Sequence, residues 1–215
     1  MNLKLILLLT CGIFWTIAYI DMIRVGVKHK TYSMPFIALS LNFSWEIYNT
    51  IQGYAYAGFH VTTIINCFWV LFDIGILSTY FKYGMASLNI SKVLFYSFSI
   101  SVILISFVFH HALAAQQGSV MGALYSGFWI NLIMSVLFIR MFYNRAPMHG
   151  QTILIALTKC IGTLAVTILV GVVGINALGG VIVSIAYVGF ITFIIDLWYI
   201  YLVVTSTRKK TLQVI

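Results

Sequence analysis

Apolar runs of membrane-spanning length dominate this sequence of 215 residues and constrain its fold more than any other feature. A helix needs about 20 predominantly apolar residues to cross a bilayer. Seven such segments lie at residues 5–23, 34–53, 62–81, 93–113, 121–141, 152–174 and 180–204. Only 7% of the residues are charged, against about 25% in soluble domains. The pattern predicts an all-α polytopic membrane protein, a single domain over residues 1–215 built as a seven-transmembrane-helix bundle.

The basic residues fall unevenly on the two sides of the predicted bundle. Alternate connections and the C-terminal tail carry Arg24, Lys28, Lys30, Lys82, Lys92, Arg140, Arg145, Arg208, Lys209 and Lys210. The other side carries Lys4 alone, and Lys159 lies within the sixth segment. The positive-inside rule therefore predicts an outside or lumenal N-terminus and a cytoplasmic C-terminus, in a bacterial inner membrane or an ER membrane. Because these charges do not form a face with interleaved aromatic residues, they do not indicate nucleic-acid binding.

The chain has four acidic residues, and three of them lie at bilayer depth. They are Asp21, Glu46, Asp73 and Asp196. Asp21 is three residues before Arg24 and is expected to form an interfacial ion pair with it. The other three come from three different helices and are expected to meet at a central cavity, because charge at bilayer depth costs a few kcal/mol or more and usually has a function.

Two roles remain open for these deep acids. Each could form only a structural hydrogen bond between helices, with Lys159 as a counter-ion. Alternatively, a buried carboxyl favours its neutral form and can donate a proton, either to a substrate or in a small seven-helix proton-coupled transporter. A transporter of this kind usually has repeated halves or paired broken helices, and the sequence indicates neither.

Polar and aromatic residues accompany these acids at helical spacing. Asn42 and Glu46 are four residues apart and share a helix face, so the amide can orient the carboxyl. Trp15, Tyr19 and Trp45 are candidates for lining a pocket, because aromatic faces suit a lipophilic substrate or a carbocation. The adjacent histidines, His110 and His111, point about 100° apart on a helix and make a poor metal pair. The cysteines are isolated within apolar runs, so we expect no metal site.

Several motifs along the chain resemble those of the integral-membrane terpene cyclases, which are known from fungal meroterpenoid and indole-diterpene biosynthesis and have bacterial relatives. The motifs are Trp15, Tyr19 and Met22, Lys28, Thr31-Tyr32-Ser33-Met34, Asn42-x-x-Trp45-Glu46, Asp73-Ile74-Gly75-Ile76, His110-x-Ala112-Leu113-Ala114-Ala115, Tyr125-Ser126 and the region of Asp196. The sequence departs from the family at Gln116, where some fungal members have an acid, at Lys159, where arginine is found, and at Asp73, where some members have asparagine.

The resemblance implies seven transmembrane helices and a cofactor-free cyclisation of a linear prenyl chain, initiated by protonation. It assigns the two catalytic acids to Glu46 and Asp196, with a lipophilic prenylated small molecule as substrate. The residues agree with this implication, because four scattered acids cannot cluster around magnesium and a diphosphate. We therefore expect a terpene cyclase, with the proton-coupled transporter as the alternative. A retinal protein is disfavoured because the seventh segment lacks a lysine for a Schiff base.

Overall fold

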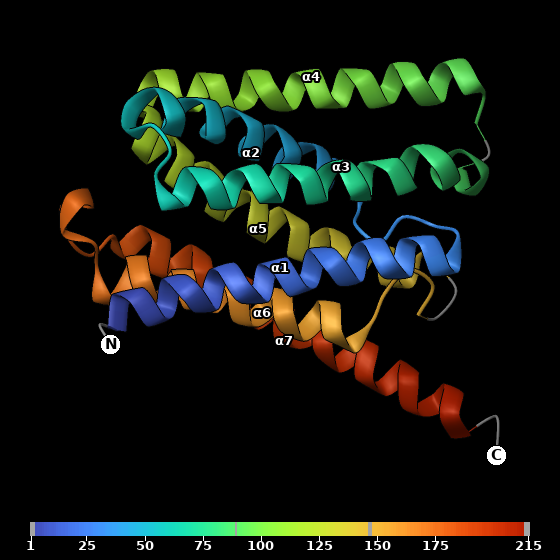
Figure 1. The fold of residues 1–215 in the computed structure, drawn as a ribbon. Coiled ribbons are helices and arrows are strands. Elements are labelled where there is room, and N and C mark those ends of the chain that lie inside the picture. Colours follow the sequence, from blue (N-terminus) through green and yellow to red (C-terminus); the bar gives the residue numbers. More distant parts are fainter. Residues whose placement is uncertain (1–2, 89, 146–147, 213–215) are drawn as a thin grey trace.

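Seven long helices make up most of the computed structural model, which describes residues 3–88, 90–145 and 148–212 (Figure 1). They are α1 (Leu3–His29), α2 (Phe36–Ala57), α3 (Val61–Leu88), α4 (Lys92–Gln117), α5 (Ser119–Tyr143), α6 (Ile153–Ile168) and α7 (Val183–Leu212). A π-helical segment, Leu169–Val173, continues α6, and a short 3-10 turn, Asn176–Leu178, follows it. The described residues contain no β-strand beyond one isolated bridge, so the predicted all-α fold is confirmed.

Most of the helices extend beyond the segments that hydropathy predicts. For example, α1 continues to His29, α3 to Leu88 and α7 to Leu212. Apolarity marks the part of a helix that lies in hydrocarbon, whereas a helix can continue as a more polar turn past the membrane surface. The sixth predicted segment has nearly the expected length, but its last turn is π-helical rather than α-helical.

Six of the seven helices are long and apolar enough to cross a membrane, among the residues that the structure describes. The exception is α2, whose sequence contains the polar residues Ser40, Asn42, Ser44, Glu46, Asn49, Thr50 and Gln52. This helix packs on α3, α4 and α5, so its neighbours can shield these polar groups. The prediction of membrane-spanning helices is thus confirmed for six segments, and α2 is a helix of the bundle with a polar face.

The chain passes back and forth along one direction, and α1 packs on α6 and α3 (Figure 1). The connections α1–α2, α3–α4 and α5–α6 lie at the same end of the bundle as the C-terminal end of α7. These are the segments in which the basic residues gather, so this end of the molecule is its basic end.

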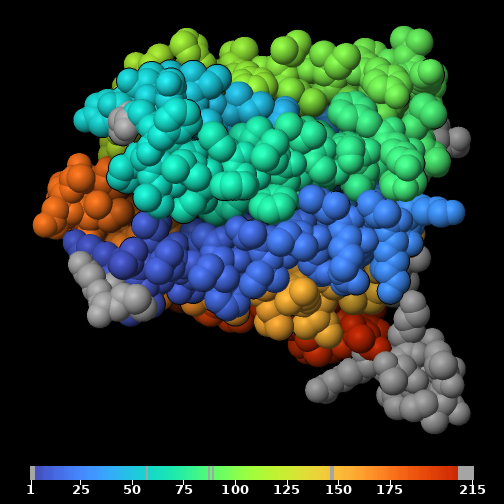
Figure 2. All heavy atoms as spheres, viewed as in Figure 1, coloured from blue at the N-terminus to red at the C-terminus, as the bar shows by residue number. Residues whose placement is uncertain are grey.

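The outer faces of the helices are apolar. Exposed side chains on α4 include Leu104, Ile105 and Val108, and Figure 2 shows the face that α1, α3 and α4 form together. Apolar side chains directed outward suit contact with lipid tails. Inside, the π-helical segment that continues α6 approaches α7 closely, because Gly171 faces Ala186, whose Cα would be 2.7 Å from an added Cβ.

Candidate functional site

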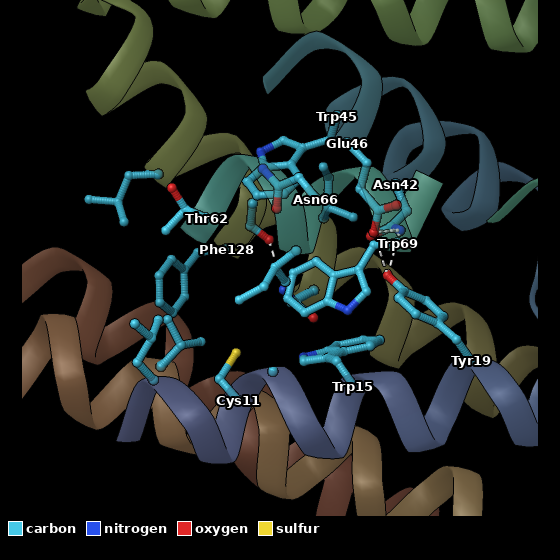
Figure 3. A pocket seen from close by; sticks show the side chains of 18 residues that line it. Cys11, Trp15, Tyr19, Asn42, Trp45, Glu46, Thr62, Asn66, Trp69 and Phe128 are labelled. Atoms are coloured by element: carbon cyan, nitrogen blue, oxygen red, sulfur yellow. Dashed lines mark hydrogen bonds between the residues drawn. The ribbon is translucent and has the colours of Figure 1, made fainter. Parts of the chain in front are cut away.

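A cavity of about 270 Å³ lies between α1, α2, α3 and α5, with α6 contributing at its edge (Figure 3). Its wall is largely apolar and aromatic, with a small polar group on one side. The lining includes Trp15, Tyr19, Asn42, Trp45, Glu46, Asn66, Trp69, Phe128 and Asn131. Five of the seven site residues that the sequence predicts therefore line one cavity, and the remaining two are Asp73 and Asp196.

Trp15 and Tyr19 enter the cavity from α1, because residues four apart share a helix face. Their ring centroids are 5.6 Å apart, and Tyr19 meets Trp69 of α3 edge to face at 6.2 Å. Gly162 on α6 makes room for Trp15, since a Cβ there would lie 2.7 Å from the indole Cδ1. The backbone of α6 thus holds this tryptophan against the cavity.

Trp45 enters from α2 and is fixed by α5. Its indole nitrogen donates a hydrogen bond to the carbonyl of Ala123 at 2.9 Å. Gly127, one turn further along α5, leaves space for the ring, because an added Cβ would lie 3.3 Å from it. The ring therefore has both a polar anchor and a close-fitting surface, which hold it in one orientation.

Glu46 lies at the centre of the polar side of the cavity and is 1% exposed. Its Oε1 accepts hydrogen bonds from the Tyr19 hydroxyl at 2.7 Å and from the Asn42 amide at 2.9 Å. The same amide nitrogen lies 2.8 Å from Oδ2 of Asp73 and 2.8 Å from the Tyr19 oxygen. An amide nitrogen carries two hydrogens, so it can serve two of these three acceptors at once. The predicted contact between Asn42 and Glu46 is confirmed.

No cation of the described residues pairs with this acidic network. The two ion pairs among the described residues lie outside this network and join Arg24 to Asp21 and Lys159 to Asp196. One carboxylate oxygen of Glu46 and one of Asp73 are also buried without a hydrogen-bond partner in the described structure. Burial without a counter-ion favours the neutral, protonated form of a carboxyl. The network can therefore hold a proton at the edge of an aromatic cavity.

Asp196 lies in a second polar cluster and is not among the residues that line the cavity. Its Oδ1 accepts a hydrogen bond from Lys159 Nζ at 2.6 Å, and Lys159 also donates to Ser135 at 2.6 Å. The sequence predicts three acids around one cavity, and this is met by Glu46 alone. Asp73 is joined to Glu46 through the Asn42 amide without lining the cavity, and Asp196 lies in a different cluster. Lys159 is the counter-ion of Asp196, as one of the two alternatives from the sequence has it.

The second cluster is connected to the cavity wall through α5. The Ser135 hydroxyl donates to the backbone carbonyl of Asn131 at 2.8 Å, and Asn131 lines the cavity. The side-chain oxygen of Asn131 also accepts a hydrogen bond from Thr163 of α6 at 3.2 Å. Lys159 of the ion pair therefore contacts α5 one turn along the helix from the lining residue Asn131.

Other predicted pairs and sites have structural roles. Asp21 pairs with Arg24 at 2.5 Å, as expected, and also accepts a hydrogen bond from Thr152 at the start of α6. His110 contacts the carbonyl of Leu41 at 2.9 Å, and His111 packs against a tyrosine. No group of three His, Cys, Asp or Glu side chains suited to a metal ion is found in the part of the chain that the structure describes.

The cavity also has lining residues that the sequence did not single out. Trp69 and Phe128 complete the aromatic wall, and Asn66 and Asn131 add polar groups. Trp69 and Phe128 lie within long apolar helices among other large apolar residues, whereas Asn66 and Asn131 are each the one asparagine of their helix, a signal that could have identified them. Only the rotation of α3 and α5 about their axes brings these four side chains to the cavity.

Comparison with protein families matches residues 1–209 to the model of the Pyr4-like transmembrane terpene cyclases. The chain belongs to this family. The match covers all seven helices almost completely, including every residue of the cavity and of the second cluster. The family that the motifs resemble is thereby confirmed.

Three similar proteins are fungal terpene cyclases. The Pyr4-family terpene cyclase mfmH of Annulohypoxylon moriforme is 35% identical over 78 residues, 36% of this chain and 31% of the relative. The terpene cyclase ascF of Acremonium egyptiacum is 33% identical over 91 residues, 39% and 32% of the two chains. The terpene cyclase dpfgB of Gibberella zeae is 26% identical over 162 residues, 74% and 66%. The matches thus cover about a third of the first two relatives and about two thirds of the third. No solved structure matches the chain significantly.

Proposed function

We propose that this chain is a transmembrane terpene cyclase, in which Glu46 protonates a linear prenyl chain and so initiates its cyclisation. The observation that carries the proposal is the position of Glu46. Its carboxyl is buried without a cation partner among the described residues, and it lines a cavity that is otherwise largely aromatic. Membership of the terpene cyclase family supports the same reaction class.

In this proposal, the Glu46 proton passes to a terminal epoxide oxygen or to a terminal alkene carbon of the substrate. Glu46 is left as a carboxylate, which the Tyr19 hydroxyl and the Asn42 amide stabilise through the hydrogen bonds they already make. The positive charge moves along the prenyl chain as rings form. The faces of Trp15 and Trp69 attract this charge, and an apolar wall limits premature capture by water. Loss of a proton or addition of one water ends the reaction.

Asp196 is the second catalytic acid that the resemblance implies, and we assign it a role in the same reaction other than proton donation. Because it is paired with Lys159 and does not line the cavity, we propose that it acts as a charged positioning group. Its effect on the substrate would pass through Lys159, Ser135 and Asn131. Asp73 would act behind Glu46, through the Asn42 amide that both carboxyls share.

A second cavity of about 550 Å³ offers room for the rest of a long substrate. It shares Trp45, Thr62, Asn66 and Leu124 with the first cavity, and it continues along α2 toward Tyr56. We propose that the reacting end of the prenyl chain lies beside Glu46 and that the remainder of the molecule occupies this extension. The substrate would then be a lipophilic prenylated small molecule that enters from the bilayer.

We further propose that α2 also crosses the membrane, shielded by α3, α4 and α5, which gives seven spans. With the charge distribution, seven spans would put the N-terminus outside or in a lumen and the basic end in the cytoplasm. The membrane would be a bacterial inner membrane or an ER membrane.

A substrate panel tests the proposed activity. Membranes containing the protein are incubated with prenylated aromatics and polyprenyl compounds, each with and without a terminal epoxide, and products are identified by mass spectrometry and NMR. We expect a product isomeric with its substrate, or one that differs by a single water. In D₂O, an alkene substrate should acquire deuterium on carbon, whereas an epoxide should give an exchangeable hydroxyl. Proton-driven uptake of the compounds without any new product would indicate the transporter instead.

A further inference from the structure

A separate cavity of about 590 Å³ lies at the basic end of the bundle. It is bordered by the α1–α2 connection, the beginning of α2 and the C-terminal end of α5, with contributions from α3 and α4. It shares no lining residue with the cavity at Glu46. The proposed cyclisation chemistry therefore does not account for it.

Arg145 is held rigidly in the wall of this cavity. Its guanidinium group lies 3.9 Å from the centroid of the Tyr32 ring, and its Nη1 donates a 2.6 Å hydrogen bond to the carbonyl of Tyr32. Its Nη2 is buried and has no hydrogen-bond partner in the described structure. A buried donor without an acceptor is costly. The side chain is thus oriented in advance, with donor capacity that the described residues do not use.

Arg140 lines the same cavity from the last turn of α5. Neither Arg140 nor Arg145 is ion-paired among the described residues, because the acid at this end, Asp21, is taken by Arg24. The lining contains no acidic residue. Two guanidinium groups without a counter-charge in one cavity favour an anion, and their planar donor sets match the oxygens of a phosphate.

Much of the remaining wall is apolar, which a free anion does not require, although Thr31, Asn144 and His149 also line it. Phe36, Ile37, Phe98 and Leu137 are among the lining residues, and Ile37 and Phe98 are each 44% exposed on the outer surface. The cavity therefore combines a basic part at the end of α5 with an apolar part that faces outward. A molecule with a charged head and a hydrocarbon tail fits both parts.

We propose that this cavity binds the phosphate group of an anionic amphiphile, with the phosphate at Arg145 and Arg140 and the tail along Phe36 and Phe98. The same phosphate chemistry could come from a membrane lipid or from a soluble phosphate. The apolar wall favours the lipid, since anionic headgroups gather where basic residues flank membrane helices.

The test uses the purified full chain and native mass spectrometry to count bound lipid. Protein is reconstituted with phosphatidylcholine alone or with added phosphatidylglycerol, and a parallel arm adds inorganic phosphate. Arg140→Gln and Arg145→Gln each remove one cation from the cavity. Lys92→Gln is the matched control, because Lys92 is exposed at the same end of the bundle and does not line the cavity. If Arg145→Gln disturbs the fold, Arg140→Gln alone is compared with wild type.

We expect phosphatidylglycerol to be retained in preference to phosphatidylcholine, with about tenfold weaker binding in each arginine variant and little change in Lys92→Gln. Retention that inorganic phosphate does not displace identifies a lipid as the source. Binding of inorganic phosphate alone, weakened by the same two variants, would identify a site for soluble phosphate and would overturn the assignment to an amphiphile. Equal retention of phosphatidylglycerol by wild type and Arg140→Gln, or no preference for the anionic lipid, would overturn the proposal.

Discussion

Replacing Lys159 with methionine should destabilise the protein strongly, because it breaks a fully buried ion pair from one side. Lys159 is 0% exposed and Asp196 is 1% exposed. The second carboxylate oxygen of Asp196 has no partner in the described structure, so Lys159 supplies the hydrogen bond that compensates for burial. Removing one partner of such a pair typically costs about 3–5 kcal/mol. We expect a loss of this size in the free energy of unfolding.

The double variant Lys159→Met/Asp196→Asn distinguishes the effect of an unpaired buried charge from the effect of changed side-chain packing. Without a charge on either side chain, most of the lost stability should return, to within about 1–2 kcal/mol of wild type, since neutral replacements of buried pairs are often well tolerated. The control Lys92→Met removes an exposed lysine from α4 and should change stability by less than about 0.5 kcal/mol.

Unfolding in mixed micelles, followed by tryptophan fluorescence and circular dichroism, measures these differences. If Lys159→Met unfolds within about 1 kcal/mol of wild type, the reasoning about the pair is refuted. The double variant also bears on Asp196. A stable double variant without cyclase activity would support its assignment as a charged positioning group, whereas full activity would remove that assignment.

Three further outcomes are expected. Gly189→Ala should destabilise the α6–α7 contact by about 1–3 kcal/mol, because its Cβ would collide with Thr167, and Thr167→Ala should recover part of the loss in thermal unfolding. Labelling of intact cells or sealed vesicles from outside should reach a tag in residues 54–61 and not one in residues 82–92; the reverse pattern would invert the orientation. Turnover should survive excess EDTA, and its loss with EDTA followed by recovery with magnesium would contradict a proton-initiated reaction.

Local spacing was sufficient to predict part of the site from the sequence. The Asn42–Glu46 and Asp21–Arg24 contacts follow from residues four and three positions apart on one helix, which the helical repeat fixes. The depth of Glu46 in its segment likewise indicated burial. These features depend on one helix at a time.

Features that depend on several helices were not predictable in the same way. The separation of Asp196 from Glu46 and the inward position of Trp69 depend on how each helix rotates about its axis. In a long apolar helix, the hydrophobic pattern is nearly the same on every face, so it does not encode this rotation. The polar residues of α2 show a related limit of hydropathy, which does not indicate that α3, α4 and α5 pack on this helix.

Substitution of Glu46 by glutamine, assayed with a substrate found in the panel, tests the central claim most directly. The amide keeps the size of the side chain and its hydrogen-bonding capacity but cannot donate the carboxylic proton. Asp73→Asn is the matched control, because it changes the other acid of the same network, which does not line the cavity. With equal amounts of folded protein in the membrane, we predict that turnover falls by about 10²–10⁴-fold in Glu46→Gln and far less in Asp73→Asn. Turnover near that of wild type in Glu46→Gln would contradict the account.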